Sequence, residues 1–92
     1  MAFTVKSRSP KVYIFGDGEM VGTNHLVYNG KARVGTVLET TCDGKHWYEA
    51  EHIYNDFGRQ RRKSIMNGQC IAHFDTLEAA LVAIEEVDTV AA

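Results

Sequence analysis

The chain has little of the material on which several protein classes depend. Of its 92 residues, two are cysteine and one is proline, so neither a disulfide-rich secreted domain nor a proline-rich linker is expected. No apolar run approaches the roughly 20 residues that cross a bilayer, and the first eleven residues lack the apolar core of a signal peptide. A formal net charge of −2 excludes a uniformly basic architectural DNA-binding protein. We therefore expect a single domain over residues 1–92, with reduced thiols, in the cytoplasm.

The charges are unevenly distributed along the sequence. Residues 1–74 hold ten Lys and Arg against seven Asp and Glu, whereas residues 75–92 hold five acids and no Lys or Arg. Four of the basic residues lie within five positions, namely Arg59, Arg61, Arg62 and Lys63. Such a chain can offer a basic patch to phosphates and an acidic surface elsewhere, although a solvated loop followed by an ordinary acidic helix has the same pattern.

Asn-Gly and Asp-Gly dipeptides predict a meander of β-hairpins. Asn29-Gly30, Asp43-Gly44 and Asn67-Gly68 suit two-residue turns, because these residue types tolerate positive φ. The segments around them are rich in β-branched and aromatic residues and predict strands at about 12–15, 26–28, 31–42, 45–53, 63–66 and 69–74. A bulge at Gly35 would restore the interrupted alternation of its strand. Residues 47–57 fit either a strand or a short helix.

The C-terminal segment predicts an amphipathic helix over residues 75–87. Asp75 is the expected N-cap, with Glu78 in the capping-box position. An apolar stripe recurs at helical spacing and consists of Leu77, Ala80, Leu81, Ile84 and Val87. The predicted fold is α+β: a twisted antiparallel sheet of hairpins with this helix packed on one face. The expected sheet partners of the stripe are Val12, Ile14, Val34, Leu38 and Ile71.

The sequence predicts no metal site and no catalytic centre. Cys42 and His46 have a spacing that zinc ligands can adopt, but Cys70 and His73 would point to opposite faces of a strand. A Gly-x-Ser-x-Gly nucleophile motif is absent. The four histidines leave a small ribonuclease with acid–base catalysis as an alternative. Because neither a metal-ligand set nor a nucleophile motif is present, we expect a non-enzymatic protein without a cofactor.

The basic cluster predicts a nucleic-acid-binding surface. Guanidinium groups form paired hydrogen bonds with phosphates, and aromatic rings stack on unpaired bases. The expected phosphate-binding residues are Arg59, Arg61, Arg62, Lys63, Lys31 and Arg33. The expected partner-binding residues are Asn55, Phe57, Gln60, Tyr28, Glu85 and Glu86.

Strand geometry limits how these residues can act together. A turn at Asn29-Gly30 would pair Tyr28 with Lys31 and place both on one face with Arg33. Within a strand, Arg62 would face away from Arg61 and Lys63. The cluster then forms one patch only in a loop or along an exposed sheet edge, where basic residues also serve to prevent strand-to-strand aggregation.

Three segments resemble the small phage-encoded anti-CRISPR proteins, in particular those that inhibit the type I-F Csy surveillance complex: MAFTVKSRSPKVYIFGDGEM, FGRQRRKSIMNGQC and AHFDTLEAALVAIEEV. The resemblance extends over the whole chain in size and organisation. It implies a non-enzymatic inhibitor that inserts between the Cas7 backbone subunits, with Cas8 or Cas5 as further candidate contacts. Such an inhibitor would touch the guide RNA (crRNA) and block its pairing with target DNA, without a membrane or a small-molecule substrate.

Two shorter segments are similar to the HicB-type antitoxin domain. DGKHWY at 43–48 and FDTLEAAL at 74–81 match a strand and the Thr-Leu-Glu-Glu-Ala-Leu helix of that family, with Ala79 in place of the second Glu. The connection between these parts is longer here than in the family. An antitoxin and a standalone RNA-binding regulator are therefore the alternatives to the inhibitor.

Overall fold

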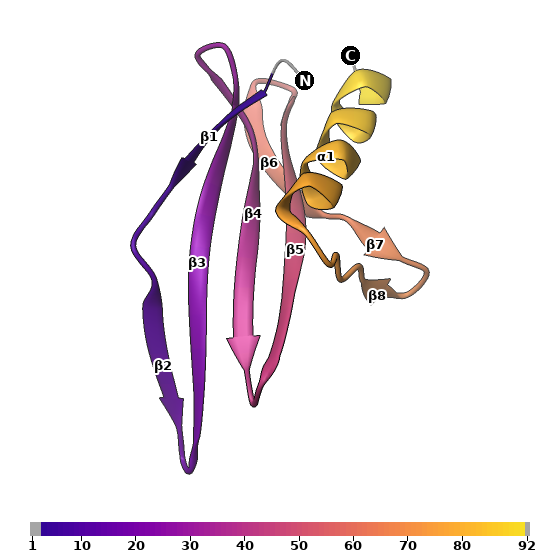
Figure 1. Ribbon diagram of the computed structural model, residues 1–92. Helices are drawn as coiled ribbons and strands as arrows, with labels where there is room; N and C mark the ends of the chain where they lie inside the picture. Colours follow the sequence, from indigo (N-terminus) through magenta and orange to yellow (C-terminus); the bar gives the residue numbers. More distant parts are fainter. Residues whose placement is uncertain (1–2, 92) are drawn as a thin grey trace.

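The computed structural model describes residues 3–91 and confirms the α+β fold (Figure 1). The described chain forms, in order, β1 (Phe3–Ser7), β2 (Lys11–Phe15), β3 (Gly18–Asn29), β4 (Ala32–Cys42), β5 (Lys45–Asp56), β6 (Arg59–Ser64), β7 (Met66–Asn67), β8 (Cys70–Ile71) and α1 (Leu77–Ala91). Six strands form an antiparallel sheet in the order β1-β3-β4-β5-β6, with β2 also paired to β3. Strands β7 and β8 pair separately. No helix in the described part is long and apolar enough to cross a membrane.

Helix α1 packs on one face of the sheet, over β4 and β5. The core between them is small and aliphatic, and its fully buried members include Val27, Val37, Ala80 and Ile84. Burying one such Val or Ile side chain contributes roughly 1.5–3 kcal/mol. Within residues 3–91, no helix covers the opposite face of the sheet.

A β-bulge brings β4 close to the helix. Val27 pairs with Gly35, but the neighbouring Tyr28 pairs with Arg33, so Val34 is the extra residue. The bulge lets two consecutive residues, Val34 and Gly35, lie buried beneath α1. A bulge in this strand is therefore confirmed, with Val34 rather than Gly35 as the extra residue.

One predicted hairpin turn is confirmed and two are displaced by one residue. Asp43 and Gly44 have φ of 51° and 76°, as a two-residue type I′ turn requires. The predicted Asn29-Gly30 turn is wrong, because Asn29 pairs with Ala32 and the loop is Gly30-Lys31. The Asn67-Gly68 turn shifts in the same way, since Asn67 pairs with Cys70. In both, the glycine takes the first loop position with positive φ, which suits a type II′ turn.

The basic segment pairs differently from the prediction. Strand β6 pairs with β5 through a turn at Phe57-Gly58, whose φ angles are 50° and 76°. The turn was not predicted, because a non-glycine residue other than Asn or Asp is uncommon at positive φ. The expected hairpin of 63–66 with 69–74 shrinks to β7 and β8. Residues 47–56 form a strand rather than a helix.

Helix α1 begins and ends later than predicted. Thr76, not Asp75, is the N-cap, because its Oγ1 accepts a hydrogen bond from the Ala79 N–H at 3.1 Å. The helix continues beyond Val87, which is exposed. The next inward position is Asp88, whose Oδ1 lies 3.0 Å from the Nε2 of buried His52.

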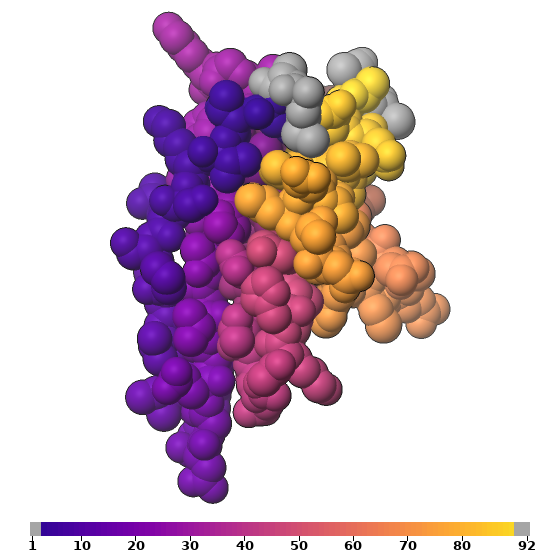
Figure 2. All heavy atoms as spheres, viewed as in Figure 1, coloured from indigo at the N-terminus to yellow at the C-terminus, as the bar shows by residue number. Residues whose placement is uncertain are grey.

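Four of the five expected core partners lie elsewhere. Val34 is in the core, whereas Val12, Ile14 and Ile71 are exposed, and Leu38 lines the uncovered face. The sheet is longer than the helix that covers it: the β2–β3 hairpin extends past the turn between β4 and β5 (Figure 2). Apolar residues at that end of the sheet therefore have no helix above them.

Candidate nucleic-acid interface

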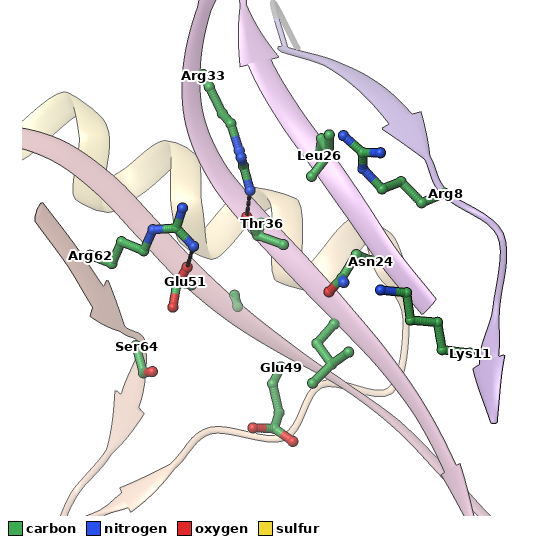
Figure 3. Close-up of a pocket in the computed structure, with 12 residues that line it drawn as sticks. Arg8, Lys11, Asn24, Leu26, Arg33, Thr36, Glu49, Glu51, Arg62 and Ser64 are labelled. Carbon is green, nitrogen blue, oxygen red and sulfur yellow. Dashed lines mark hydrogen bonds and ion pairs between the residues drawn. The ribbon is translucent and has the colours of Figure 1, made fainter. Parts of the chain in front are cut away.

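The face of the sheet opposite α1 contains an open groove (Figure 3). Its volume is about 570 Å³. The lining residues are Arg8, Lys11, Asn24, Leu26, Arg33, Thr36, Leu38, Glu49, Ala50, Glu51, Arg62 and Ser64. Because they come from the β1–β2 connection and from β2, β3, β4, β5 and β6, the groove crosses the width of the sheet.

Basic side chains outnumber acidic ones in the lining of the groove. Arg8 and Lys11 approach from the β1–β2 side, Arg62 from the β6 side and Arg33 from one end, against two carboxylates, Glu49 and Glu51 (Figure 3). Leu26 and Leu38 provide apolar floor between them. The surface is suited to an extended anion that also has apolar parts.

Arg33 is held over the groove by a single strong contact. Its Nη2 donates a hydrogen bond to Thr36 Oγ1 at 2.7 Å. Its Nε is buried without a hydrogen-bond partner among the described residues, and a buried donor left without an acceptor costs about 1–3 kcal/mol. An anion in the groove would relieve that cost if the Arg33 side chain turned so that its Nε donated a hydrogen bond to the anion.

The ion pair of Arg62 with Glu51 is weak enough for Arg62 to bind a ligand. Its Nη1 lies 3.7 Å from Glu51 Oε1, and both side chains are partly exposed. Ion pairs of this kind contribute about 0–1 kcal/mol. A phosphate that forms two hydrogen bonds with the guanidinium can therefore compete with Glu51.

The structure divides the predicted basic cluster between two faces. The register of β6 places Arg62 and Gln60 on the groove face, and Arg59, Arg61 and Lys63 on the face that carries α1. Arg61 Nε also pairs with Asp56 Oδ2 at 3.2 Å. Because β6 is an edge strand, all four residues lie along one exposed sheet edge, although they point to both faces. An exposed edge is the arrangement in which such a cluster can still act as a single patch.

Of the other predicted binding residues, some lie on the groove face and some do not. Tyr28 pairs with Arg33, and Asn55 with Gln60, so these residues share the groove face. Lys31 lies in the β3–β4 turn and does not pair with Tyr28, which corrects the predicted register.

The other partner-binding candidates lie outside the groove. Phe57 is at the tip of the β5–β6 turn and is 98% exposed. Glu85 and Glu86 are on α1, across the sheet from the groove, and Glu85 is half-buried. These acidic residues therefore cannot share a ligand with the groove residues.

Three basic residues of the uncovered face were missed in the sequence. Arg8 and Lys11 line the groove, and Lys6, paired with Leu26, places its Nζ 5.4 Å from the ring centre of Tyr28. The spacing of Lys6 and Arg8 by two residues is the signal that could have revealed them, because such residues lie on one face of a strand.

A second polar cluster lies on the helix-bearing face. Glu39 Oε1 is 2.8 Å from His25 Nε2, and its Oε2 is 2.7 Å from His46 Nε2. Ser7 Oγ lies 2.7 Å from His25 Nδ1. Hydrogen bonds from His46 and His25 lower the pKa of Glu39 below its ordinary value of 4.5. Burial, assisted by the charge of Glu39, raises the pKa of Tyr48 beside it.

The cluster has no metal-binding geometry. No three His, Cys, Asp or Glu side chains in the described part of the chain are placed to hold a metal ion. Cys42 and His46, the pair with a zinc-like spacing, lie on opposite faces: Cys42 pairs with Lys45, the residue before His46. Cys42 and Cys70 are both free thiols.

Comparison of the chain with protein-family models, with curated proteins and with solved structures finds no match.

Proposed function

We propose that the protein is a non-catalytic binding protein whose groove takes the backbone of a single-stranded RNA. Its target is the guide RNA of a type I-F Csy complex in the cytoplasm of a phage-infected cell, where it acts as an anti-CRISPR inhibitor. The observation that carries this proposal is the groove on the uncovered sheet face, with Arg8, Lys11, Arg33 and Arg62 around it.

The groove chemistry suits a nucleic-acid strand better than a small metabolite. Its basic side chains come from strands at both sides of the sheet, and neighbouring strands lie about 4.8 Å apart. The cations are therefore spread along a line rather than focused on one point. Tyr28 and the amides of Asn55 and Gln60 on the same face offer stacking and hydrogen bonding to exposed bases.

The two faces of the sheet support a role in a ribonucleoprotein rather than on free RNA. The groove side carries Arg8, Lys11, Arg33 and Arg62. On the other side, α1 exposes Glu78 and Glu86 and has no basic residue in its last turn, and the basic residues of that face lie apart from the helix, on the edge strand β6. An inhibitor that lies along a protein-bound guide needs one surface for RNA and another for basic protein. Occupancy alone then prevents pairing with target DNA, and no catalytic group is required.

The same groove also fits the second candidate, a standalone RNA-binding regulator. This candidate differs in one property: it binds free RNA, with an affinity that falls steeply as salt increases. The antitoxin alternative needs a cognate toxin as its partner.

The test is a pull-down of the tagged protein from cells that express a type I-F Csy complex, with a binding assay on free guide RNA beside it. We expect retention of the assembled complex, loss of target-DNA binding by that complex, and weak binding of free RNA. Tight binding of free RNA without retention of the complex would assign the regulator role instead. Failure of both assays would refute both RNA-based functions.

Charge-reversal variants test whether inhibition depends on the groove residues. The double variant Arg8→Glu/Arg62→Glu alters two exposed groove residues, and Arg59→Glu/Lys63→Glu changes charge equally on the opposite face of β6. We expect the first to lose inhibition and the second to retain most of it. Equal loss in both variants would instead place the RNA along the sheet edge.

A further inference from the structure

Strand β2 is a sheet edge that is unusually open and apolar. No described strand pairs with its outer side. Its four apolar residues Val12, Tyr13, Ile14 and Phe15 are 57%, 44%, 76% and 61% exposed. Edge strands usually carry charges, prolines or bulges that prevent association, whereas the one charge in β2 is Lys11 at its start. Contiguous exposed apolar residues of this kind indicate a contact surface.

The other edge of the sheet is protected in the usual way. Strand β6 carries Arg59, Arg61, Arg62 and Lys63, so two copies paired along it would oppose like charges. Extension of the sheet is therefore favoured at β2 and opposed at β6.

We propose that two copies of the chain associate through β2, antiparallel and edge to edge, about a two-fold axis at Tyr13. The β2–β3 hairpin has the two-residue loop Gly16-Asp17, because Phe15 pairs with Gly18. The residues that flank such a loop form a hydrogen-bonded pair, and pairs alternate along the ladder. The main-chain groups of Val12 and Ile14 therefore point outward, free to bond a further strand.

These outward groups favour one register. Val12 opposite Ile14 of the second copy lets both residues exchange N–H···O=C bonds, with Tyr13 facing Tyr13. Pairing Val12 with itself would place Pro10, which has no N–H, opposite Ile14. Pairing Ile14 with itself would require Gly16 to be extended, but its φ of 52° belongs to the turn.

The side chains are self-complementary in this register. On the helix-bearing face Val12 meets Ile14 of the second copy, so two apolar side chains cover each other. On the groove face Tyr13 meets Tyr13, and Lys11 meets Phe15, where an ammonium group can lie over the ring. This match is the reason to assign a second copy, rather than an unrelated strand, to the edge. Paired residues share a face, so both grooves open on the same side of one continuous sheet.

Sedimentation equilibrium over a range of protein concentrations tests the association, which does not depend on what the groove binds. We expect the mass to rise from 10.3 kDa toward twice that value. Val12→Lys/Ile14→Lys, which opposes like charges across the axis, should stay monomeric. Val12→Glu/Ile14→Lys, which opposes unlike charges, should recover the dimer. A wild-type monomer up to millimolar concentration, or two variants that behave alike, would overturn the proposal.

Disulfide trapping tests the register in a Cys42→Ser/Cys70→Ser background, which removes both native thiols. Across a non-hydrogen-bonded pair the Cα atoms lie about 4.5 Å apart, a distance that a disulfide can span. Tyr13→Cys should therefore form a covalent dimer on mild oxidation, whereas the matched control Val12→Cys, which faces Ile14 rather than itself, should not. Cross-linking of Val12→Cys at an equal or greater rate would refute the axis at Tyr13.

Discussion

Gly35 of β4 lies directly beneath Ile84 of α1, and the space between them accommodates no side chain. A Cβ at position 35 would lie 3.0 Å from Ile84 Cδ1 and 2.7 Å from the main-chain oxygen of Glu51. One contact is a buried side chain of the helix and the other is the backbone of β5, so neither can move without displacing an element. The approach of the helix to the sheet therefore depends on this glycine.

Gly35→Ala is expected to destabilise the fold by about 1–3 kcal/mol, the usual range for overpacking a core. Chemical denaturation gives the free energy of unfolding directly. The matched control is Gly22→Ala in β3, where a Cβ would make ordinary contacts at 3.6 Å with Leu38 and Tyr13. Similar effects of the two substitutions would mean that helix and sheet separate easily.

The fold could be predicted because turns and helices are marked by local sequence patterns. The core residues could not be predicted, because the strand register decides which side chains lie opposite one another. Asp43-Gly44 marks its turn correctly, and the apolar spacing of Leu81 and Ile84 marks the buried side of the helix. A one-residue displacement of the turn at Gly30 changes every cross-strand pair that follows from it. The sequence also does not reveal that the β2–β3 hairpin extends past the helix, and this extension exposes Val12 and Ile14.

The bond between His52 and Asp88 connects β5 to the final turns of α1. His52 is buried, and its Nε2 lies 3.0 Å from Asp88 Oδ1. Asp88→Ala should lower the free energy of unfolding by about 1–3 kcal/mol, because it leaves a buried ring nitrogen without its partner. Glu86→Ala, which removes an exposed carboxylate from the same helix, should change it little. The two variants can be compared by thermal and chemical unfolding, and equal stability would contradict a structural role for this bond.

Glu39 should make the stability depend on acid pH. Its pKa is lowered in the folded protein by hydrogen bonds from His46 and His25, so its stabilising contribution is complete above pH 4.5 and is lost as the pH falls through the folded pKa. At pH 7, Glu39→Gln should be less stable than wild type by about 1 kcal/mol, because an amide oxygen accepts weaker hydrogen bonds from His46 and His25 than a carboxylate does.

Urea unfolding at pH 7, 5 and 3 measures this dependence. The difference between wild type and Glu39→Gln should persist at pH 5, which lies above the lowered pKa of Glu39, and should shrink toward pH 3. The control Glu86→Gln should follow wild type throughout. A difference that is constant across the three pH values would show that Glu39 acts without its charge.

The candidate site was only partly predictable, for a reason visible in β6. The alternation of Arg61 and Arg62 between faces follows from strand geometry, but the face that carries the groove depends on where α1 packs. Arg8 and Lys11 were not predicted because no strand was expected at β1 and the next strand was expected to begin at residue 12. Their place beside β3 depends on pairings between residues distant in the sequence. Local patterns identify charges, while the sheet topology decides which of them share a surface.

Phe57 combines strain and exposure in a way that its turn does not require. Its φ is 50°, and its side chain is 98% exposed, although a non-glycine residue in this region costs of the order of 1–3 kcal/mol. Asn-Gly is the preferred pair for such a turn. Phe57→Asn should therefore stabilise the protein by about 1 kcal/mol, whereas Asp43→Asn at the same position of the β4–β5 turn should change little.

The same substitution tests whether the phenyl ring has a partner. If Phe57 contacts the Csy complex, as the sequence led us to expect, Phe57→Asn should retain less of that complex in a pull-down while its unfolding midpoint rises. Phe57→Tyr, which keeps the ring and the strain, should retain the complex at the wild-type stability. A more stable Phe57→Asn variant with undiminished retention would remove Phe57 from the interface and leave its strain without a functional explanation.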